Sequence, residues 1–369
     1  VTDVGIDELD GLVALARDEA VDLVVVGPEA PLVAGLVDRL DAAGIAAFGP
    51  SGAAAALEGS KSFAKEVMQA AGVPAAANLP VAGAPCVVKA DGLAAGKGVV
   101  IAGDAGEARA ALADLLEGRR FDTELVVVEE CLAGVEVSLL ALCDGERAIP
   151  MAPAQDYKRI HAGDRGPNTG GMGSYSPVPW IDADRAEALV AEIHQPIVEL
   201  MRRRGTPFRG VLYAGLMLTA AGPRVLELNV RFGDPETQAV LPRLRGDLLE
   251  VLAAAARPGG LAGARLEWSP RCAVTVVLAS RGYPASSSSG DEIRGLDAVD
   301  PAVEVTHAGT ARVDGRVVTA GGRVLNLTAL ADDPERARVA AYAAADVIEF
   351  DGMQLRRDIA ARAPGPVSA

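Results

Sequence analysis

The sequence has few of the residues that usually mark metal, redox or nucleic-acid sites. Among its 369 residues are three histidines and four cysteines, and aromatic residues make up 4% of the chain. The cysteines are far apart in apolar runs and form no C-x-x-C pair, so we interpret them as reduced core thiols of a cytoplasmic protein. His161, His194 and His307 show no metal-ligand spacing, and we expect them at scattered surface or core positions.

The sequence also lacks an excess of positive charge and any long apolar run. A net charge of -15 argues against a nucleic-acid partner, because backbone phosphates are bound mainly by clustered Lys and Arg. No apolar run approaches the ~18 residues of a membrane helix, and the opening "VTDVGIDELDGL" has no signal-peptide layout. We therefore expect a cytoplasmic protein that acts on small molecules, with neither a nucleic-acid nor a membrane partner. We also expect a monomer.

The segment "GLAAGKG" resembles a phosphate-binding P-loop but lacks two of its features. Only three residues separate Gly92 from Gly96, and Gly98 follows Lys97 where a Ser or Thr would hold magnesium. The flanking runs "CVVKA" and "GVVIAG" are β-branched, so the glycines join two strands rather than a strand and a helix. The pattern predicts a glycine-rich hairpin with Lys89 on its first strand.

The remaining chain predicts a multidomain protein with both α/β and α+β parts. The first sixty residues alternate helix, strand, helix over 32–44, and strand, which predicts β/α winding with a parallel sheet. Such a domain normally opens with a strand and a glycine turn, so a segment upstream is expected. Later segments predict helices over 60–71, 104–118, 182–205 and near 332–350, and a long irregular ligand-binding loop over 154–180.

The most informative stretch is "VLYAGLMLTAAGPRVLELNVRFGDPETQ", residues 211–238, which predicts a hairpin. In its second strand Glu227, Asn229 and Arg231 alternate with apolar residues that begin at Leu226, so three polar side chains share one face. An exposed sheet face with a surface ion pair would give the same alternation.

The continuation of this strand favours a functional site over an exposed face. The turn "FGDPE" adds two acids, Asp234 and Glu236. Glutamate and asparagine oxygens, together with nucleotide phosphates and water, form a suitable shell for Mg2+. Glu227 and Asn229 are therefore candidate metal ligands.

Several motifs, in this order, resemble the ATP-grasp carboxylate-amine ligases. They are "SKSFAK" with Lys65, "VVKADGLAAGKGVV" with Lys89, "VVVEECLAGVE", and "ELNVRFGDPETQ". More narrowly, "GPEAPLV", "AQDYKR", "GPNTGGMGSYSP", "GVLYAGLM", "HAGT" and "GGRVL" resemble the phosphoribosylamine-glycine ligase family, the glycinamide ribonucleotide synthetases of purine biosynthesis. The similarity runs from about residue 21 to about residue 360.

The resemblance implies an ATP-grasp fold and a specific reaction. Its parts would be a partial Rossmann-like N-terminal domain (1–64), a small lid subdomain (65–134), a large ATP-grasp subdomain (135–265) and a C-terminal α+β domain (266–369). The implied reaction joins glycine to 5-phosphoribosylamine with ATP, through a glycyl phosphate. Another ATP-grasp ligase with a different acid or amine is the alternative, and a nucleotide-binding regulator without turnover is a further one.

The resemblance also assigns residues to roles. Lys89 and Arg231 would be catalytic, and Glu227 and Asn229 would bind Mg2+ or Mn2+. The ATP-binding residues would be Lys65, Lys89, Gly92, Gly96, Gly98, Glu129, Glu130, Leu132 and Glu136. The substrate-binding residues would be Glu29, Asp156, Asn168, Thr169 and Asp234.

Some positions fall outside these assignments. The strand "AGLMLT" offers no further acid, so a two-ion cluster held wholly by side chains is not expected. Tyr157 stands where the family usually has a histidine, and neither His307 nor Arg323 receives a definite role.

Overall fold

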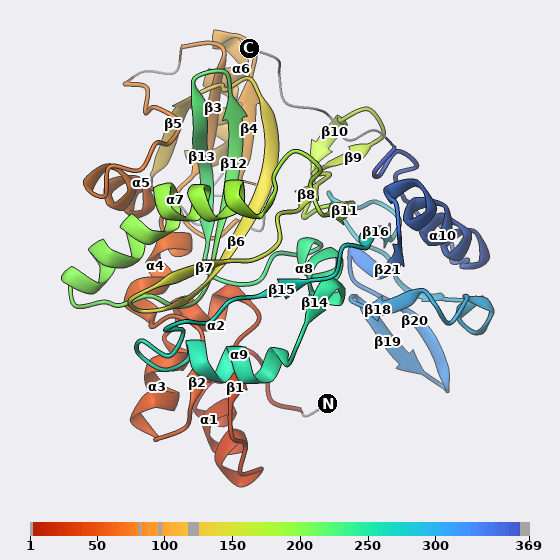
Figure 1. The fold of residues 1–369 in the computed structure, drawn as a ribbon. Coiled ribbons are helices and arrows are strands. Elements are labelled where there is room, and N and C mark those ends of the chain that lie inside the picture. The colour runs from red at the N-terminus through yellow and green to blue at the C-terminus, as the bar shows by residue number, and fades with distance from the viewer. Residues whose placement is uncertain (1–2, 81–82, 95–97, 117–124, 362–369) are drawn as a thin grey trace.

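The computed structural model describes residues 3–80, 83–94, 98–116 and 125–361. In Figure 1 the N-terminal helices lie at the bottom, a lid with α6 lies at the top, and the C-terminal strands and helix lie to the right of the central strands. Within the described residues, no helix is both long and apolar enough to cross a membrane.

The N-terminal region is a small parallel strand pair covered by helices. Strands β1 (Val24–Val25) and β2 (Ala47–Phe48) run parallel, which confirms the expected β/α winding. The surrounding helices are α1 (Leu9–Asp18), α2 (Glu29–Val33), α3 (Leu36–Ala42) and α4 (Gly52–Gly59). The single helix expected over 32–44 is wrong, because Gly35 adopts a left-handed φ of 84° and separates α2 from α3.

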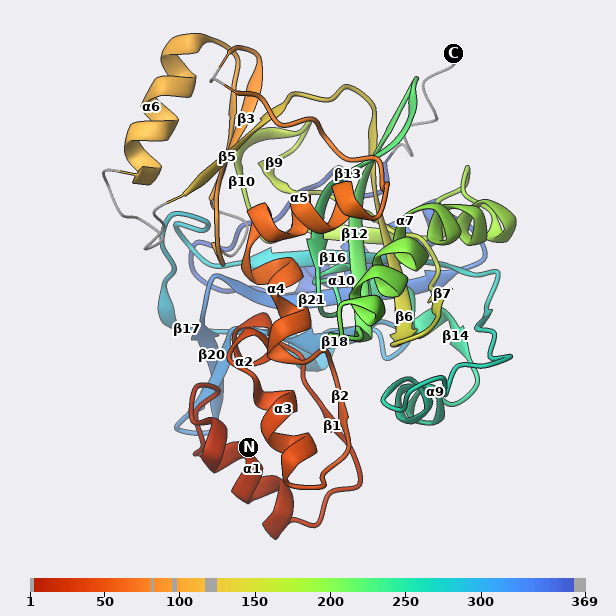
Figure 2. The same cartoon turned by 90° about the vertical axis from the view of Figure 1, so that its left-hand side faces the viewer.

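The lid has a core of its own. Strands β3 (Cys86–Ala90), β4 (Val99–Ala102) and β5 (Val126–Glu130) form an antiparallel sheet, and helix α6 (Ala105–Leu116) packs against it. Figure 2 shows this body above helix α5 (Lys61–Ala70), which begins at the Ser60 cap as expected. The predicted hairpin is confirmed, with Lys89 opposite Val99. Gly96 and Lys97 lie outside the described residues.

The central sheet is buried on both faces. Its antiparallel order is β13 (Gly222–Asn229), β12 (Arg209–Thr219), β6 (Val135–Asp144) and β7 (Ala148–Pro150). Along β6, Leu139 and Ala141 join the core that contains α7 (Ala183–Arg203), whereas Leu140 and Leu142 join the core beneath α9 (Leu248–Ala255). Apolar residues on both faces fix the sheet as the middle layer.

A bulge in β13 corrects the expected alternation. Gly215 of β12 pairs with Glu227, but the next residue, Leu216, pairs with Val225, so Leu226 is an extra residue. The buried apolar residue at this point of the strand is therefore Val225 and not Leu226, which lines the pocket described below. Glu227 and Asn229 keep the shared face that the sequence predicts.

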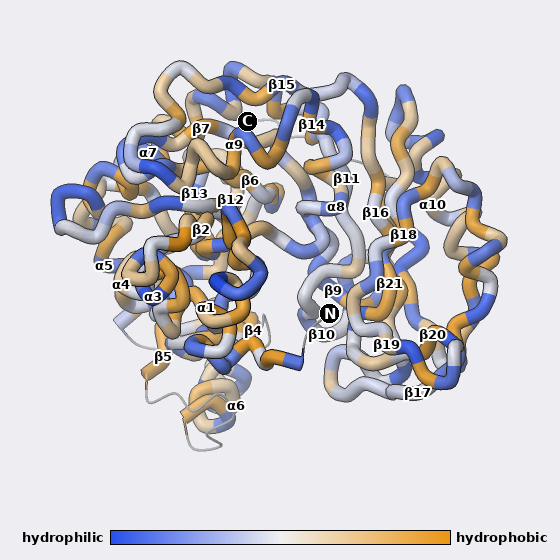
Figure 3. Tube along the Cα trace, turned by 90° about the horizontal axis from the view of Figure 1, so that it is seen from below, coloured by the Kyte–Doolittle hydropathy of each residue, from blue (hydrophilic) through white to orange (hydrophobic). Residues whose placement is uncertain are grey.

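The C-terminal region is built on two sheets and one helix. The larger sheet has the order β18 (Glu304–His307), β21 (Arg323–Ala331), β16 (Cys272–Ala279), β11 (Gly173–Ser176) and β8 (Gln155–Asp156), and α10 (Pro334–Val347) packs on it. The smaller sheet contains β17 (Ser289–Glu292), β20 (Arg316–Ala320) and β19 (Thr310–Val313). Figure 3 shows this region beside the N-terminal helices, with α8 (Glu236–Val240) between them.

The irregular loop expected over 154–180 is wrong. It contains β8, the hairpin of β9 (Arg159–His161) and β10 (Arg165–Asn168), and β11. The glycine-rich composition hides these strands. Strand β11 pairs with β8 on one side and, on the other, with β16, a hundred residues along the chain. The remaining short elements are η1 (Leu241–Arg243), β14 (Leu244–Arg245), β15 (Glu267–Trp268) and η2 (Leu296–Ala298). The domain limits expected from the sequence stay predictions.

His194 of α7 is a core residue, in line with the expectation of scattered histidines. Its side chain is fully buried, Nε2 lies 3.2 Å from the Leu139 carbonyl oxygen, and Nδ1 has no hydrogen-bond partner among the described residues. Burial lowers the pKa of His194 to about 4. The unfolded chain, with an ordinary histidine pKa, therefore takes up this proton at a higher pH than the folded chain.

Replacing this histidine should make the protein more resistant to acid. Between about pH 6.5 and pH 4 the folded state loses stability as the pH falls, by up to roughly 3 kcal/mol for a shift of this size. We expect the free energy of unfolding of His194→Met to fall less than that of the wild type as the pH is lowered. Urea unfolding from pH 7.5 to 4.5 measures both. His161→Met, at an exposed site on β9, is the control. Parallel pH curves for wild type and His194→Met would contradict the prediction.

Candidate active site

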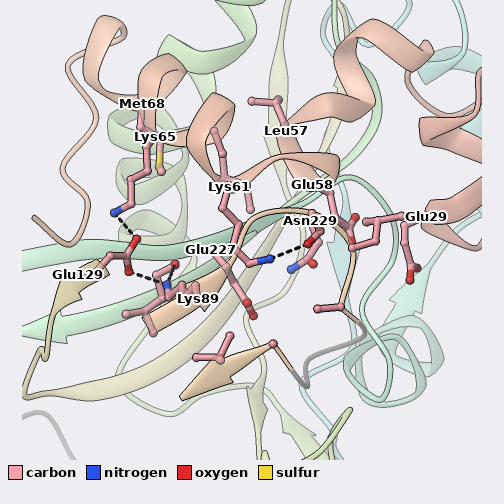
Figure 4. A pocket seen from close by; sticks show the side chains of 18 of the residues that line it. Glu29, Leu57, Glu58, Lys61, Lys65, Met68, Lys89, Glu129, Glu227 and Asn229 are labelled. Atoms are coloured by element: carbon pink, nitrogen blue, oxygen red, sulfur yellow. Dashed lines mark hydrogen bonds and ion pairs between the residues drawn. The ribbon is translucent and has the colours of Figure 1, made fainter. Parts of the chain in front are cut away.

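A pocket lies where the lid, the helices α4 and α5, and strand β13 meet (Figure 4). Eight of the nineteen described residues that line it are charged. Its cations are Lys61, Lys65, Lys89 and Arg231, and its anions are Glu29, Glu58, Glu129 and Glu227. All of these charged residues except Glu58 and Lys61 were predicted from the sequence, and the predicted residues Asn229, Gly92 and Gly98 line the pocket as well.

Glu129 stands between two lysines at one side of the pocket. Its carboxylate oxygens lie 2.6 Å from Lys65 Nζ and 2.6 Å from Lys89 Nζ. Lys65 also donates to the Ala76 carbonyl oxygen, and Lys89 to that of Leu226. The three side chains are nearly buried, and burial lowers the pKa of Lys65 against the opposing effect of Glu129. The lining as a whole carries as many anions as cations, but around Glu129 two ammonium groups face one carboxylate, so this side of the pocket is locally positive and suits an anionic ligand.

The neighbouring acid has a different role. Glu130 accepts a hydrogen bond from the Ala77 amide at 2.8 Å, and its own amide donates to the Ala77 carbonyl oxygen. Glu130 therefore ties β5 to the strand-like segment before β3, whereas Glu129 faces the pocket. Leu132 follows in the connection to β6 and does not line this pocket.

Arg231 is held by two acids at the other side of the pocket. Its Nε lies 3.1 Å from Glu29 Oε2, and its Nη2 lies 3.3 Å from Glu58 Oε1. Glu58 also accepts a hydrogen bond from the Val230 amide. Burial raises the pKa of Glu58 to about 7, although Arg231 opposes the shift. The guanidinium is thus fixed in the pocket before any ligand binds.

Glu227 is paired with a lysine that the sequence interpretation did not select. Lys158 Nζ lies 3.0 Å from Glu227 Oε1 and 2.5 Å from Glu136 Oε1. The Lys158 ammonium lowers the pKa of Glu227 to about 2, so this carboxylate is ionised at neutral pH. Glu136 does not line the pocket itself but is joined to it through Lys158.

The candidate substrate residues other than Glu29 gather beside the pocket rather than in it. Thr169 Oγ1 donates to the Lys158 carbonyl oxygen, and Asn168 ends β10. Asp156 Oδ1 is buried and has no hydrogen-bond partner within the part of the chain that the structure describes. Burial, with the nearby Glu236 carboxylate, raises the pKa of Asp156 well above its usual value. Asp234 pairs with Arg323.

Arg323 has partners that fix two loops of this second group. Its Nη1 donates to the carbonyl oxygens of Gly170 and Asp234, both at 2.7 Å, and its Nη2 lies 2.8 Å from Asp234 Oδ2. Position 171, in the loop next to Gly170, accommodates only a glycine. A Cβ there would lie 2.3 Å from Pro235 Cδ and 2.7 Å from Asp156 Oδ1.

Two residues that the sequence left without a role have structural partners. The Tyr157 hydroxyl accepts a hydrogen bond from the Ala360 amide, and the Arg356 guanidinium lies 4.9 Å from the centre of its ring. His307 is exposed, with Nδ1 3.0 Å from Thr310 Oγ1. Both contacts belong to the C-terminal region.

Glu58, Lys61 and Lys158 are the charged residues that the sequence interpretation missed. Lys61 Nζ donates to the Gly92 carbonyl oxygen at 2.8 Å and so contacts the glycine-rich hairpin. A signal was present, because Lys61 lies in "SKSFAK" and Lys158 in "AQDYKR". Glu58 precedes the first of these motifs by two residues, on a helix that was not predicted.

Side chains in the described part of the chain form no cluster of three or more His, Cys, Asp or Glu residues that could hold a metal ion. A metal at Glu227 and Asn229 would therefore need ligands from bound molecules. This requirement is considered below with the proposed function.

Comparisons with protein families confirm the resemblance. Models of phosphoribosylglycinamide synthetase match residues 1–58 (N domain), 59–237 (ATP-grasp (A) domain) and 273–362 (C domain). The phosphoribosylamine-glycine ligase of Streptomyces coelicolor is 53% identical over 379 residues, covering 98% of this chain and 89% of that protein. The ligase of Xanthomonas axonopodis pv. citri is 49% identical and covers 97% of this chain and 86% of that protein.

Solved structures agree with these matches. The crystal structure of the phosphoribosylamine-glycine ligase from Thermotoga maritima superposes with a TM-score of 0.74 at 36% identity, covering 85% of this chain and 81% of that chain. The biotin carboxylase domain of the Hydrogenobacter thermophilus 2-oxoglutarate carboxylase has a TM-score of 0.69 at 17% identity, covering 96% of this chain and 81% of that chain. The fold is ATP-grasp, as expected from the sequence.

The position of Glu129 between two lysines generates a stability prediction. Glu129→Gln leaves two nearly buried ammonium groups without their counter-charge, which should lower the free energy of unfolding by roughly 3 kcal/mol. Glu130→Gln is the matched control, because a glutamine keeps an oxygen for the Ala77 amide, and we expect a loss below about 1 kcal/mol. Urea unfolding at pH 7 measures both. Equal losses in the two variants would rule out this role for Glu129.

Proposed function

The chain belongs to the phosphoribosylglycinamide synthetase family, and from that premise we propose that its pocket joins glycine to 5-phosphoribosylamine with ATP. The products are glycinamide ribonucleotide, ADP and phosphate, a step of purine biosynthesis. One observation carries the proposal: two nearly buried ammonium groups, Lys65 and Lys89, share a pocket with the oxygen donors Glu227 and Asn229.

The lysines would bind the phosphates of ATP. Their net positive charge acts in a largely water-free place, where attraction to an anion is much stronger than in bulk water. The hairpin that carries Gly92 and Gly98 lines the same pocket and can bring backbone N–H groups to the phosphates. The segment from Glu129 to Leu132 would face the adenine, and Glu136 the ribose.

The residues present fit a magnesium or manganese ion. Glu227 is ionised at neutral pH and Asn229 supplies an amide oxygen, a donor set that Mg2+ completes with phosphate oxygens and water. When bound, the ion would neutralise phosphate charge during transfer. The Hydrogenobacter thermophilus structure, which shares the fold, is described as a complex with MgADP.

The reaction would proceed in two steps in this pocket. The glycine carboxylate attacks the terminal phosphorus of ATP, which gives a glycyl phosphate and ADP. The amine of phosphoribosylamine then attacks the carbonyl carbon of glycyl phosphate, the C–O bond to phosphate breaks, and phosphate and one amine proton are released. Arg231, fixed by Glu29 and Glu58, would stabilise the negative charge on the acyl phosphate. The lid would exclude water, because water hydrolyses an acyl phosphate.

The acceptor substrates would lie on the side of Asp156, Asn168, Thr169 and Asp234. The unpartnered Oδ1 of Asp156 is the most specific indication, because a buried polar atom normally has a partner. An ammonium group of glycine, or a hydroxyl of the sugar, would provide one. A cationic ligand would also favour the ionised form of this carboxyl group.

Glu227→Gln tests the proposed metal and nucleotide site. We expect ADP formation to fall by roughly 100-fold or more, with the circular dichroism spectrum unchanged, because the amide is a poorer Mg2+ ligand. ADP and glycinamide ribonucleotide are measured with ATP, Mg2+ and glycine, with and without freshly generated phosphoribosylamine. Glu250→Gln, at an exposed site on α9, is the control and should keep full activity.

The same assay tests the proposed substrates. One glycinamide ribonucleotide per ADP, formed only with both acceptors, is the expected result. ADP formed with a different acid or amine would reassign the substrates while keeping a ligase. ATP binding with no ADP formed under any of these conditions would contradict the proposed function.

A further inference from the structure

Lys158 joins two carboxylates that come from different strands of the central sheet. The acids Glu136 on β6 and Glu227 on β13 flank β12, where they are opposite Met217 and Gly215, respectively. These positions are two residues apart on β12 and so share one face of the sheet. The Lys158 ammonium lies between the two acids, 2.5 Å from one and 3.0 Å from the other.

The strand between the two acids leaves room for this arrangement. Gly215 has no side chain, and a Cβ built there would lie 3.2 Å from Glu227 Cγ. The same strand supplies no acid to this face. A cation between Glu136 and Glu227 balances the two negative charges, since two unbridged carboxylates would repel each other.

The backbone of Lys158 is fixed by a neighbouring loop. Its carbonyl oxygen accepts hydrogen bonds from the Thr169 amide at 2.7 Å and from Thr169 Oγ1 at 2.8 Å. Thr169 Oγ1 in turn accepts one from the Gly171 amide at 3.0 Å. Hydrogen bonds thus join the motifs "AQDYKR" and "GPNTGG", and they fix the backbone position from which the Lys158 ammonium group extends.

We propose that Lys158 is a tethered cation that takes the place of a second divalent ion between Glu136 and Glu227. A lysine ammonium is a compact point charge, and here it bridges two carboxylates as a shared metal ion would. Lys158 contacts Glu227 through Oε1, and Glu227 and Asn229 would hold the single ion. The inference rests on the proposed function only in requiring that metal and nucleotide bind here.

Counting bound Mn2+ tests this role without turnover. The free Mn2+ signal is followed by electron paramagnetic resonance, with ADP equimolar with the protein and no glycine or phosphoribosylamine. We expect one ion per chain for the wild type and for Lys158→Arg, and two for Lys158→Met, where both carboxylates become available. Lys158→Met combined with Glu136→Gln should return the count to one.

Arg159→Met is the matched control, because it removes the adjacent cation, whose guanidinium donates to the Gly166 carbonyl oxygen. Its count should stay at one. Two ions on the wild type would overturn the proposal whatever the variants do, and so would a folded Lys158→Met that binds only one. Circular dichroism checks the fold of each variant, and the wild-type count remains decisive if Lys158→Met unfolds.

The outcome is independent of the ligase assay. If the enzyme forms no ADP from glycine and phosphoribosylamine and yet binds one Mn2+ ion as wild type and two as Lys158→Met, the proposed substrates are wrong. That result would leave the role of Lys158 in place. Active enzyme with two ions on the wild type would do the reverse.

Discussion

The buried contact of Glu129 with Lys65 and Lys89 is the constraint on which the site depends. Lys65 comes from α5 in the body of the molecule, whereas Lys89 and Glu129 come from β3 and β5 of the lid. Lys89 also reaches the Leu226 carbonyl oxygen, which the bulge in β13 presents. The same charges therefore hold the lid on the body and create the surplus of positive charge that suits a phosphate. A bound anion would share these lysines with Glu129, which couples ligand binding to the position of the lid.

Features that depend on a few neighbouring residues could be predicted from the sequence. Ser60 caps α5, the β-branched runs around Gly92 and Gly98 make a hairpin, and the alternation after residue 226 places Glu227 and Asn229 on one face. Each of these follows from local steric and hydrogen-bonding rules. The ATP-grasp fold as a whole was accessible only through the resemblance of long motifs, because no local pattern states how the lid and the central sheet meet.

What the sequence could not provide are contacts between distant segments. Gly35 splits a helix that periodicity alone extends across it, and β11, within the segment 154–180, pairs with the distant strand β16. Lys158 is the clearest case. It lies in a motif that pointed to Asp156, yet its partners, Glu136 and Glu227, come from two strands that are far from it and from each other in the sequence. Only the sheet register reveals that the two acids share a face.

The C-terminal region contributes to the site by fixing the positions of two loops beside it. Arg323, at the start of β21, holds the Gly170 and Asp234 carbonyls, so the loop with Thr169 and the turn before α8 are fixed against the same guanidinium. Thr169 then fixes the backbone of Lys158. This chain of contacts runs from the C-terminal sheet to the carboxylate of Glu227 without passing through the lid. A movement of the lid would therefore leave the proposed metal ligand and its neighbouring cation in place, which suits a site that has to admit a nucleotide and still keep its charges preorganised.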